Sequence, residues 1–249
     1  RLGEIHNKTG LRVPGFFVVT STAHDLFLRE NDLQTEIDRR LQSADFADFS
    51  SLGRICEEIR VLITTSPVPD KLSHEIYHAY DQLTESAAEP VKLAIRSSAK
   101  GEDSDGSSFA GQYDSKLNVE RKGLLQAYKE VIASQYSLQA TIYRFNCGIK
   151  NEGNVMSVGC MQMIDSVTGG ITYSRDPFQP DEEETIINAS WGLPSSVMDG
   201  SVTGDRFAVS CRKPYRSLRQ TIHEKPIQAI CSDEDGILKE PVSESMRNT

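Results

Sequence analysis

The segment from residue 93 to residue 113 most constrains how this chain can fold, because a short apolar run leads directly into a loop of glycine, serine and aspartate. The run Leu93–Ile95 contains a β-branched residue and predicts a buried strand. Arg96 follows this run directly. After the loop, a second strand is predicted to begin at Phe109.

The chemistry of this segment suits a bound phosphate. Two strands joined by a small-residue loop can present backbone N–H groups to a polyanion. Arg96 would supply a forked, permanently charged clamp, and Ser97 and Ser98 would add hydroxyl groups. An alternative is a surface hairpin, in which Arg96 pairs with a loop carboxylate. A divalent cation would reconcile these carboxylates with a phosphate, since both bind Mg²⁺ through oxygen; the carboxylates are Glu102, Asp103 and Asp105.

Periodicity along the rest of the chain predicts a mixture of helices and strands. Apolar residues recur at helical spacing in six segments, and we predict helices there: 21–30, 32–43, 50–64, 70–86, 120–137 and 138–145. The first residues, 1–8, read as the end of a further helix. Short β-prone runs predict strands at 16–19, 154–164, 171–174, 186–190 and 207–209.

The predicted helix 70–86 contains an H-E-x-x-H pattern, which is typical of zinc peptidases. At 3.6 residues per turn, Leu72, Ile76 and Tyr80 share one face of the helix. His74 and His78 then project to the opposite face, toward water. A catalytic zinc pair would face a cleft, so we expect this pattern to be a coincidence and predict no metal site.

Composition excludes several classes of function. The formal net charge of −9, without a concentrated basic patch, argues against a nucleic-acid or anionic-membrane partner. No apolar run is long enough to cross a bilayer, and no signal peptide is visible. The five cysteines are scattered and form no C-x-x-C pair. Reduced thiols in a cytoplasmic protein are therefore expected.

Several segments, in this order along nearly the whole chain, resemble the nucleotide-binding domain shared by phosphoenolpyruvate synthase and pyruvate phosphate dikinase. They are 10–20 with its Pro-Gly-Phe, 95–118, 143–144, 158–164, 170–177 and 187–193. The resemblance implies an α+β, ATP-grasp-like fold, with two lobes of mainly antiparallel sheet, flanking helices, and both ends incomplete. It divides the chain into an N-terminal lobe with the phosphate loop, 1–153, and a second lobe, 154–249.

The resemblance also implies the ligands and their contacts. ATP and Mg²⁺ would bind, with Arg96 as the catalytic phosphate clamp. The adenine edge would meet the end of the strand at Gln162, Met163 and Ile164. The remaining expected contacts with ATP are the hydroxyl groups and glycine near the phosphates, with two further neighbours: Ser97, Ser98, Ser108, Ser174, Gly111, Gln112 and Trp191.

The implied function is transfer of a phosphoryl or pyrophosphoryl group from ATP to a histidine on another domain of a longer chain, and then to pyruvate or a related acceptor. In the resembled family, Gly-Glu generally stands where this chain has Pro194 and Ser195. The family also places a phosphate-binding lysine before Arg1, and a metal-binding glutamate and a Gln-x-Arg pattern beyond Thr249. The alternative is therefore a regulatory module that binds ATP without turning it over.

Overall fold

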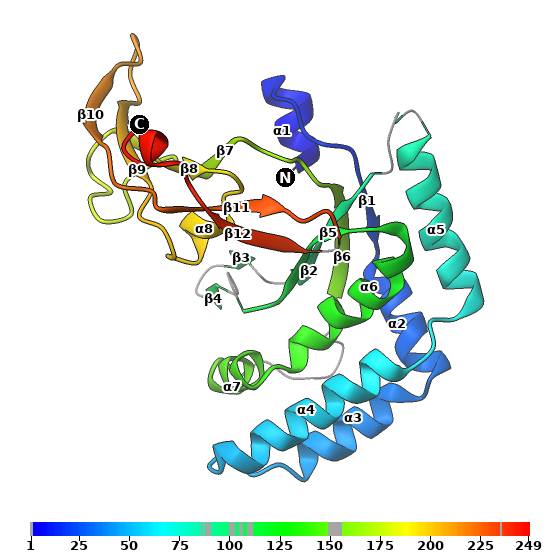
Figure 1. Ribbon diagram of the computed structural model, residues 1–249. Coiled ribbons are helices and arrows are strands. Elements are labelled where there is room, and N and C mark those ends of the chain that lie inside the picture. Colours follow the sequence, from blue (N-terminus) through cyan, green and yellow to red (C-terminus); the bar gives the residue numbers. More distant parts are fainter. Residues whose placement is uncertain are drawn as a thin grey trace. The chain divides into compact units, whose positions relative to one another are not determined.

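The computed structural model describes residues 2–85, 87, 91–99, 103–104, 107–108, 112–148, 156–234 and 236–249. The chain forms two compact units, unit 1 over residues 1–163 and unit 2 over residues 164–249. Each unit contains an antiparallel sheet, so the prediction of a mixed α+β fold with two sheet-bearing lobes is confirmed (Figure 1). This architecture is consistent with an ATP-grasp-like fold.

Unit 1 is organised around a four-stranded sheet. Its strand order is β1-β6-β2-β5, and every neighbouring pair is antiparallel. The strands are β1 (Phe16–Val19), β6 (Met156–Gln162), β2 (Leu93–Ala99) and β5 (Ser115–Val119). β6 lies between β1 and β2 and pairs with both, so the strand expected at the start of the second lobe belongs to unit 1. The two compact units divide between residues 163 and 164, and the lobe boundary at 153/154 stays a prediction.

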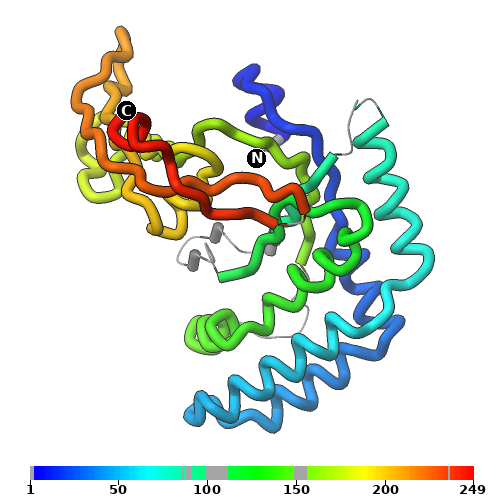
Figure 2. Tube along the Cα trace, in the orientation of Figure 1, coloured from blue at the N-terminus to red at the C-terminus, as the bar shows by residue number. Residues whose placement is uncertain are grey.

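The helices of unit 1 follow the predicted periodicity closely. They are α1 (Leu2–Thr9), α2 (Ser21–Glu30), α3 (Leu33–Gln42), α4 (Phe49–Thr65), α5 (Asp70–Thr84), α6 (Leu124–Ala133) and α7 (Leu138–Asn146). Figure 2 shows α3 turning back to run alongside α4. The predicted helix 120–137 is shorter than expected, because 3₁₀ turns at Arg121–Gly123 and Ser134–Tyr136 replace its ends.

One face of this sheet packs on the helices and forms the apolar core of unit 1. Ile95, Val158 and Cys160 of the sheet are fully buried in one cluster with Ile59 of α4 and Tyr128 of α6. Burying apolar side chains of this size supplies about 1.5–3 kcal/mol each. The helices therefore cover one face of the sheet, and the side chains on the opposite face do not belong to this apolar core.

The histidines of the H-E-x-x-H pattern lie on the exposed side of α5, as predicted. Leu72, Ile76 and Tyr80 are buried, whereas His74 and His78 are exposed and their rings stack 6.3 Å apart. In the described part of the chain, no three His, Cys, Asp or Glu side chains are grouped as a metal site would require.

Arg144 is buried despite its charge, and its side chain is only 1% exposed. It donates to the carbonyl of Gln135, and its guanidinium lies 5.6 Å from the centre of the Tyr136 ring. Helical spacing could not reveal this, because the 3₁₀ turn that receives Arg144 lies outside its own helix.

Unit 2 contains a second four-stranded antiparallel sheet, of order β10-β9-β8-β7. The strands are β7 (Thr168–Tyr173), β8 (Glu184–Trp191), β9 (Asp205–Ser210) and β10 (Ser217–Thr221). Unit 2 also contains a hairpin of β11 (Ile227–Cys231) and β12 (Ile237–Pro241), the short helix α8 (Ser195–Met198) and a 3₁₀ turn at Glu244–Met246.

Unit 1 also contains two strands of two residues each, β3 (Asp103–Ser104) and β4 (Ser107–Ser108), which pair with each other.

Among the described residues, no helix has both the length and the apolar character that a bilayer-spanning segment requires.

Candidate nucleotide site

The pleat of the unit 1 sheet decides which predicted site residues share a face. Residues directly opposite each other in an antiparallel pair point to the same side, and neighbours along a strand alternate. Ile95 lies opposite Cys160 and faces the helices. Arg96, one residue further, therefore points to the other face, opposite Gly159.

Arg96 is available to bind an anion. Its side chain is exposed, and among the described residues no group makes a hydrogen bond or ion pair with its guanidinium. Gly159 lies opposite and Ser115 of β5 lies on the other side, so both neighbours are small. A Cβ at Gly159 would meet only the Arg96 carbonyl within 4 Å. The residues directly opposite Arg96 on both neighbouring strands are therefore small.

The same alternation separates the other strand residues. Ser98 lies on the face of Arg96, whereas Ser97, opposite Val158, lies on the helix face. Gln162 lies opposite Leu93 and also faces the helices. Met161, which was not among the predicted contacts, lies opposite Ala94 on the face of Arg96. The alternation of side chains along a strand was the signal in the sequence that would have predicted Met161, in place of Gln162, on the face of Arg96.

The backbone at the end of β6 leaves one donor. The N–H of Gln162 donates to the Gly15 carbonyl at 2.9 Å, and the N–H of Met163 donates to the Lys92 carbonyl at 2.8 Å. Both amides are used by the sheet. No described group accepts a hydrogen bond from the N–H of Ile164, which is the next donor along the chain.

The loop residues of the predicted cradle are described only in part. Gly111 lies outside the described residues, and so do the carboxylates of Glu102 and Asp105. Ser108 is the last residue of β4. Gln112 is half-buried, and its side-chain oxygen has no hydrogen-bond partner in the described part of the chain.

The predicted contacts in unit 2 follow two neighbouring strands. Ser174 comes directly after β7 and is exposed. Trp191 ends β8, and its indole Nε1 donates to the Met246 carbonyl at 2.9 Å. Gly170 lies opposite Ala189, where a Cβ would lie 2.1 Å from the Asn188 carbonyl oxygen, so only glycine fits at this position.

Pro194 and Ser195 start a helix in place of supplying a carboxylate. Pro194 precedes α8, and a Cβ at Gly169 would lie 2.7 Å from its ring, so the two are tightly packed. The Ser195 hydroxyl is buried and has no partner among the described residues.

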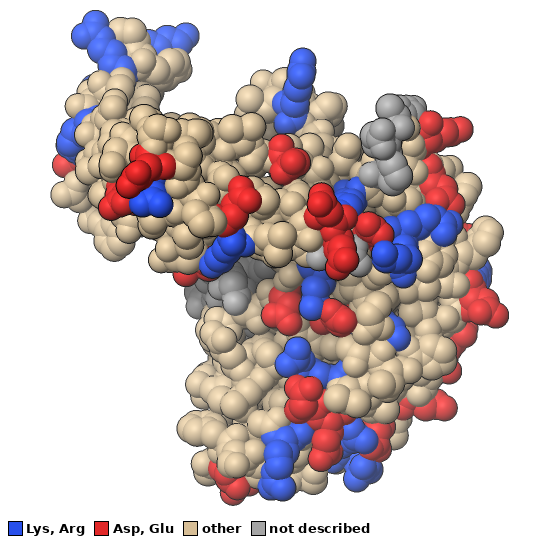
Figure 3. Space-filling model, in the orientation of Figure 1, with Lys and Arg blue, Asp and Glu red and all other residues tan. Residues whose placement is uncertain are grey.

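A buried carboxylate of unit 2 near Ser174 is neutralised by an arginine of the same unit. Asp176 is buried and accepts from Arg206 at 2.5 Å and from the backbone N–H of Phe178 at 2.9 Å. Acidic and basic side chains are interspersed over the face shown in Figure 3, and they do not gather into a basic stripe on it. This pattern gives no support to a nucleic-acid surface on that face.

The α+β architecture with two antiparallel sheets is consistent with the ATP-grasp-like class of nucleotide-binding domains. The sequence matches, over residues 1–249, the family described as "Pyruvate phosphate dikinase, AMP/ATP-binding domain". The chain therefore belongs to this family and is an AMP/ATP-binding domain, as the resemblance predicted.

Curated relatives agree with this assignment. The chain is 36% identical to a probable phosphoenolpyruvate synthase of Staphylothermus marinus, over 94% of this chain and 28% of the relative. It is 33% identical to the phosphoenolpyruvate synthase of Neisseria meningitidis, over 93% of this chain and 31% of the relative. It is 32% identical to the phosphoenolpyruvate synthase of Escherichia coli, over 89% of this chain and 29% of the relative. The chain thus spans about a third or less of the length of these three relatives.

Proposed function

We propose that this chain binds ATP with Arg96 as the phosphate clamp and, within a phosphoenolpyruvate synthase-like enzyme, presents it for transfer of a phosphoryl or pyrophosphoryl group. The acceptor would be a histidine on another domain of a longer chain, and from there pyruvate or a related molecule. The observation that carries this proposal is the exposed Arg96 guanidinium on the sheet face away from the helices, which has no partner in the part of the chain that the structure describes. Such transfer depends on positioning and on neutralising charge more than on covalent chemistry of this domain.

The alternation of side chains between the two faces of the sheet limits which of the predicted residues can contact the same nucleotide. Arg96 and Ser98 share a face with Met161 and with Met163, which lies about 13 Å along the strands from Arg96 at the rise of a β-strand. A purine would pack on the methionines and accept from the Ile164 N–H, while the phosphates reach Arg96. The other predicted residues remain proposed contacts with ATP: Ser97, Ser108, Gly111, Gln112, Gln162, Ser174 and Trp191. Of these, Ser97 and Gln162 lie on the helix face of the sheet, opposite to Arg96.

Magnesium would arrive with the nucleotide. The described residues contain no cluster of three acidic or histidine side chains, so they do not form a preassembled cation site. Mg²⁺ neutralises phosphate charge when it is bound. The groups of this chain that would complement it are the Arg96 guanidinium and nearby hydroxyls, which bind and orient the phosphates.

The absent carboxylate at 194–195 favours a second candidate, a regulatory module that binds ATP without consuming it. Measuring ATP affinity and ATP consumption on the same preparation, for the chain alone and for any longer polypeptide that contains it, separates the two. Binding without turnover in both would reject the enzyme. Turnover in the longer polypeptide would reject the passive module.

Trp191 is the only tryptophan of the chain and provides the binding assay. We expect Mg-ATP to shift its emission. Arg96→Ala should remove the shift at moderate ATP, because a charged hydrogen bond to phosphate contributes about 1.5–3 kcal/mol. The control is Arg54→Ala, on the exposed surface of α4. An unchanged response in Arg96→Ala would refute the clamp.

A further inference from the structure

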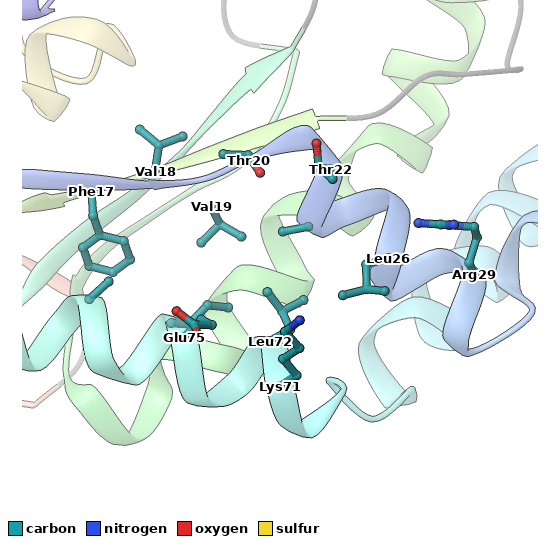
Figure 4. A pocket seen from close by; sticks show the side chains of 13 residues that line it. Phe17, Val18, Val19, Thr20, Thr22, Leu26, Arg29, Lys71, Leu72 and Glu75 are labelled. Carbon is teal, nitrogen blue, oxygen red and sulfur yellow. The ribbon is translucent and has the colours of Figure 1, made fainter.

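A groove runs along the free edge of β1, away from the face of Arg96. It is lined by residues of β1, α2 and α5 and has a volume of about 450 Å³. Figure 4 shows Phe17 and Val19 of β1 pointing toward Leu72 and Glu75 of α5, while Val18 points to the opposite side of the strand. Lys71 of α5 and Leu26 and Arg29 of α2 complete the walls.

The groove lies on the side of β1 to which Phe17 and Val19 point, and it reaches the edge of the strand. Four consecutive residues, 17–20, line it, and Val18, whose side chain points to the other side, can line it only through atoms at the strand's edge. β1 is the last strand in its sheet order, and among the described strands it pairs with β6 alone.

The backbone of this edge presents unused hydrogen-bonding groups. Gln162 donates to Gly15, which sets the alternation: Phe17 and Val19 bond to β6, whereas the N–H and C=O groups of Phe16 and Val18 point outward. No described backbone group bonds to these outward groups. Phe16 and Val18 also expose 42% and 46% of their surfaces. An exposed apolar strand edge of this kind is a template for another strand.

The walls define the side chains that such a strand would carry. Leu72 and Ile76 of α5 and Leu26 of α2 form an apolar floor beside Val19. A residue added opposite Phe17 or Val19 points to this floor, so two apolar side chains spaced two residues apart would fill the groove. At the Gly15 end, α5 closes on the strand, because a Cβ there would lie 2.6 Å from Leu83 Cδ1.

Two basic side chains, Lys71 and Arg29, line the groove on the side of Thr20. Lys71 is exposed there and has no ion-pair partner in the described part of the chain. Arg29 also lines the groove, but it pairs with Asp25 at 3.2 Å. An acidic residue beside the apolar pair would complement Lys71.

We propose that the β1 edge and its groove bind an extended peptide segment, which adds a strand to the unit 1 sheet and carries two alternate apolar residues with an acidic residue at the Thr20 end. This is strand addition: the backbone provides the affinity and the groove selects the side chains. The inference does not rest on the proposed ATP chemistry, since it uses a different edge of the sheet.

The test uses the 249-residue chain and two fluorescein-labelled peptides, Glu-Leu-Thr-Leu-Thr for antiparallel addition and Thr-Leu-Thr-Leu-Glu for parallel addition. Fluorescence anisotropy measures binding, and the amide resonances of Phe16 and Val18 locate it by NMR. One peptide should bind and shift both amides. In the antiparallel peptide, replacing the central Thr by Pro removes the N–H that faces Val18, and this should weaken binding about tenfold or more. In the parallel peptide, the N–H that meets the Val18 carbonyl belongs to the leucine after the central Thr, so N-methylation of that leucine is the matching change.

Variants of the protein provide the matching half of the test. Val18→Pro removes an outward N–H and leaves the bonds of Phe17 and Val19 to β6 in place, so it should weaken binding about tenfold. Lys71→Glu should weaken it about fivefold, and Arg54→Glu, at an exposed site on α4, should leave it unchanged. If Val18→Pro does not fold, the proline peptide tests the same hydrogen bond from the other side.

Three results would overturn the proposal. The first is equal binding of the threonine and proline peptides, and the second is no binding of either orientation at the solubility limit. The third is a different occupant: a dimer that Val18→Pro dissociates would assign the edge to a second copy, and decanoate binding without peptide binding would assign the groove to a small apolar carboxylate.

Discussion

Units 1 and 2 are both built on a four-stranded antiparallel sheet, but they are stabilised differently. The apolar core of unit 1 joins its sheet to α2–α6 through a single large cluster of buried side chains. In unit 2 the buried apolar residues described are few and smaller on average: Ile186, Leu193, Val202, Ala208, Ala229 and Val242. Ion pairs and buried polar groups occupy more of unit 2.

The best-defined polar centre of unit 2 is Lys225, which is 1% exposed. Its Nζ donates to Asp205 Oδ1 at 2.7 Å and to the His223 carbonyl at 2.8 Å, and the His223 N–H donates to the same Asp205 oxygen at 2.9 Å. Further pairs join Arg219 to Glu182 and Glu184. The acidic residues Glu182, Glu183 and Glu184 therefore bind arginine side chains. The comparison shows that similar sheets can be held by apolar burial or by a charge network.

The two units can be observed separately. Trp191, the only tryptophan, lies in unit 2, so its emission reports that unit. The long helices described lie in unit 1, and the unit 2 helix α8 spans only four residues, so far-UV circular dichroism reports mainly unit 1. The three predictions that follow use this difference.

The largest effect is expected from Ile59→Ala in the apolar core of unit 1. Ile59 is fully buried on α4, and its truncation should lower the free energy of unfolding by about 3–4 kcal/mol, because a cavity adds to the lost burial. Denaturant unfolding should show the shift by circular dichroism and little by tryptophan emission. Val61→Ala, 49% exposed on the same helix, should change stability by less than about 0.5 kcal/mol. Equal shifts of both probes would show that the units unfold together.

A slightly smaller effect, in the other unit, is expected from Lys225→Met. Removing one partner leaves the buried Asp205 carboxylate without its cation, which should cost about 3 kcal/mol. Here the tryptophan transition should move and the circular dichroism transition should not. The control, Lys239→Met, breaks an exposed pair with Asp199 and should cost less than about 1 kcal/mol. A stabilised Lys225→Met variant would mean that the charge network does not support unit 2.

The smallest effect is a pH dependence of unit 1. Burial lowers the pKa of His24 from 6.5 to about 4, an effect that the charge of Asp25 partly offsets. The folded chain resists a proton that the unfolded chain accepts, so this contribution is complete above pH 6.5 and is lost as the pH falls toward 4. Between pH 7.5 and pH 5, unit 1 should lose about 2 kcal/mol.

Two variants check the assignment to His24. His24→Gln keeps a side-chain acceptor for the Met156 N–H, which lies 2.8 Å from His24 Nδ1, and should flatten the pH profile measured by circular dichroism. His74→Gln, at an exposed position of α5, should leave it unchanged. A profile that is the same in His24→Gln and in the unaltered chain would remove His24 as the cause.

The predictions from sequence succeeded where the deciding interactions are local. Apolar spacing located α2 to α5, and it also placed His74 and His78 on the exposed side of their helix. The predicted start of this helix at residue 70 also agrees with the structure, in which Asp70 is the first residue of α5.

The candidate site was only partly accessible from sequence. Its central arginine followed from the position of Arg96 after an apolar run, and the alternation along a strand was sufficient to see that Ser97 points away from Arg96. What could not be seen is that the amides of Gln162 and Met163 are taken by Gly15 and Lys92, because those partners lie far away along the chain.

By itself the sequence determined the family, the helices and the outward direction of the H-E-x-x-H histidines, because collinear motifs and helical periodicity are properties of neighbouring residues. Only the tertiary structure decided that β6 completes the first sheet, that Arg144 is buried, and that His24 binds Met156 across the core. Each of these depends on which distant segments pair, and strand pairing and burial are set by the whole chain and not by any short stretch of it.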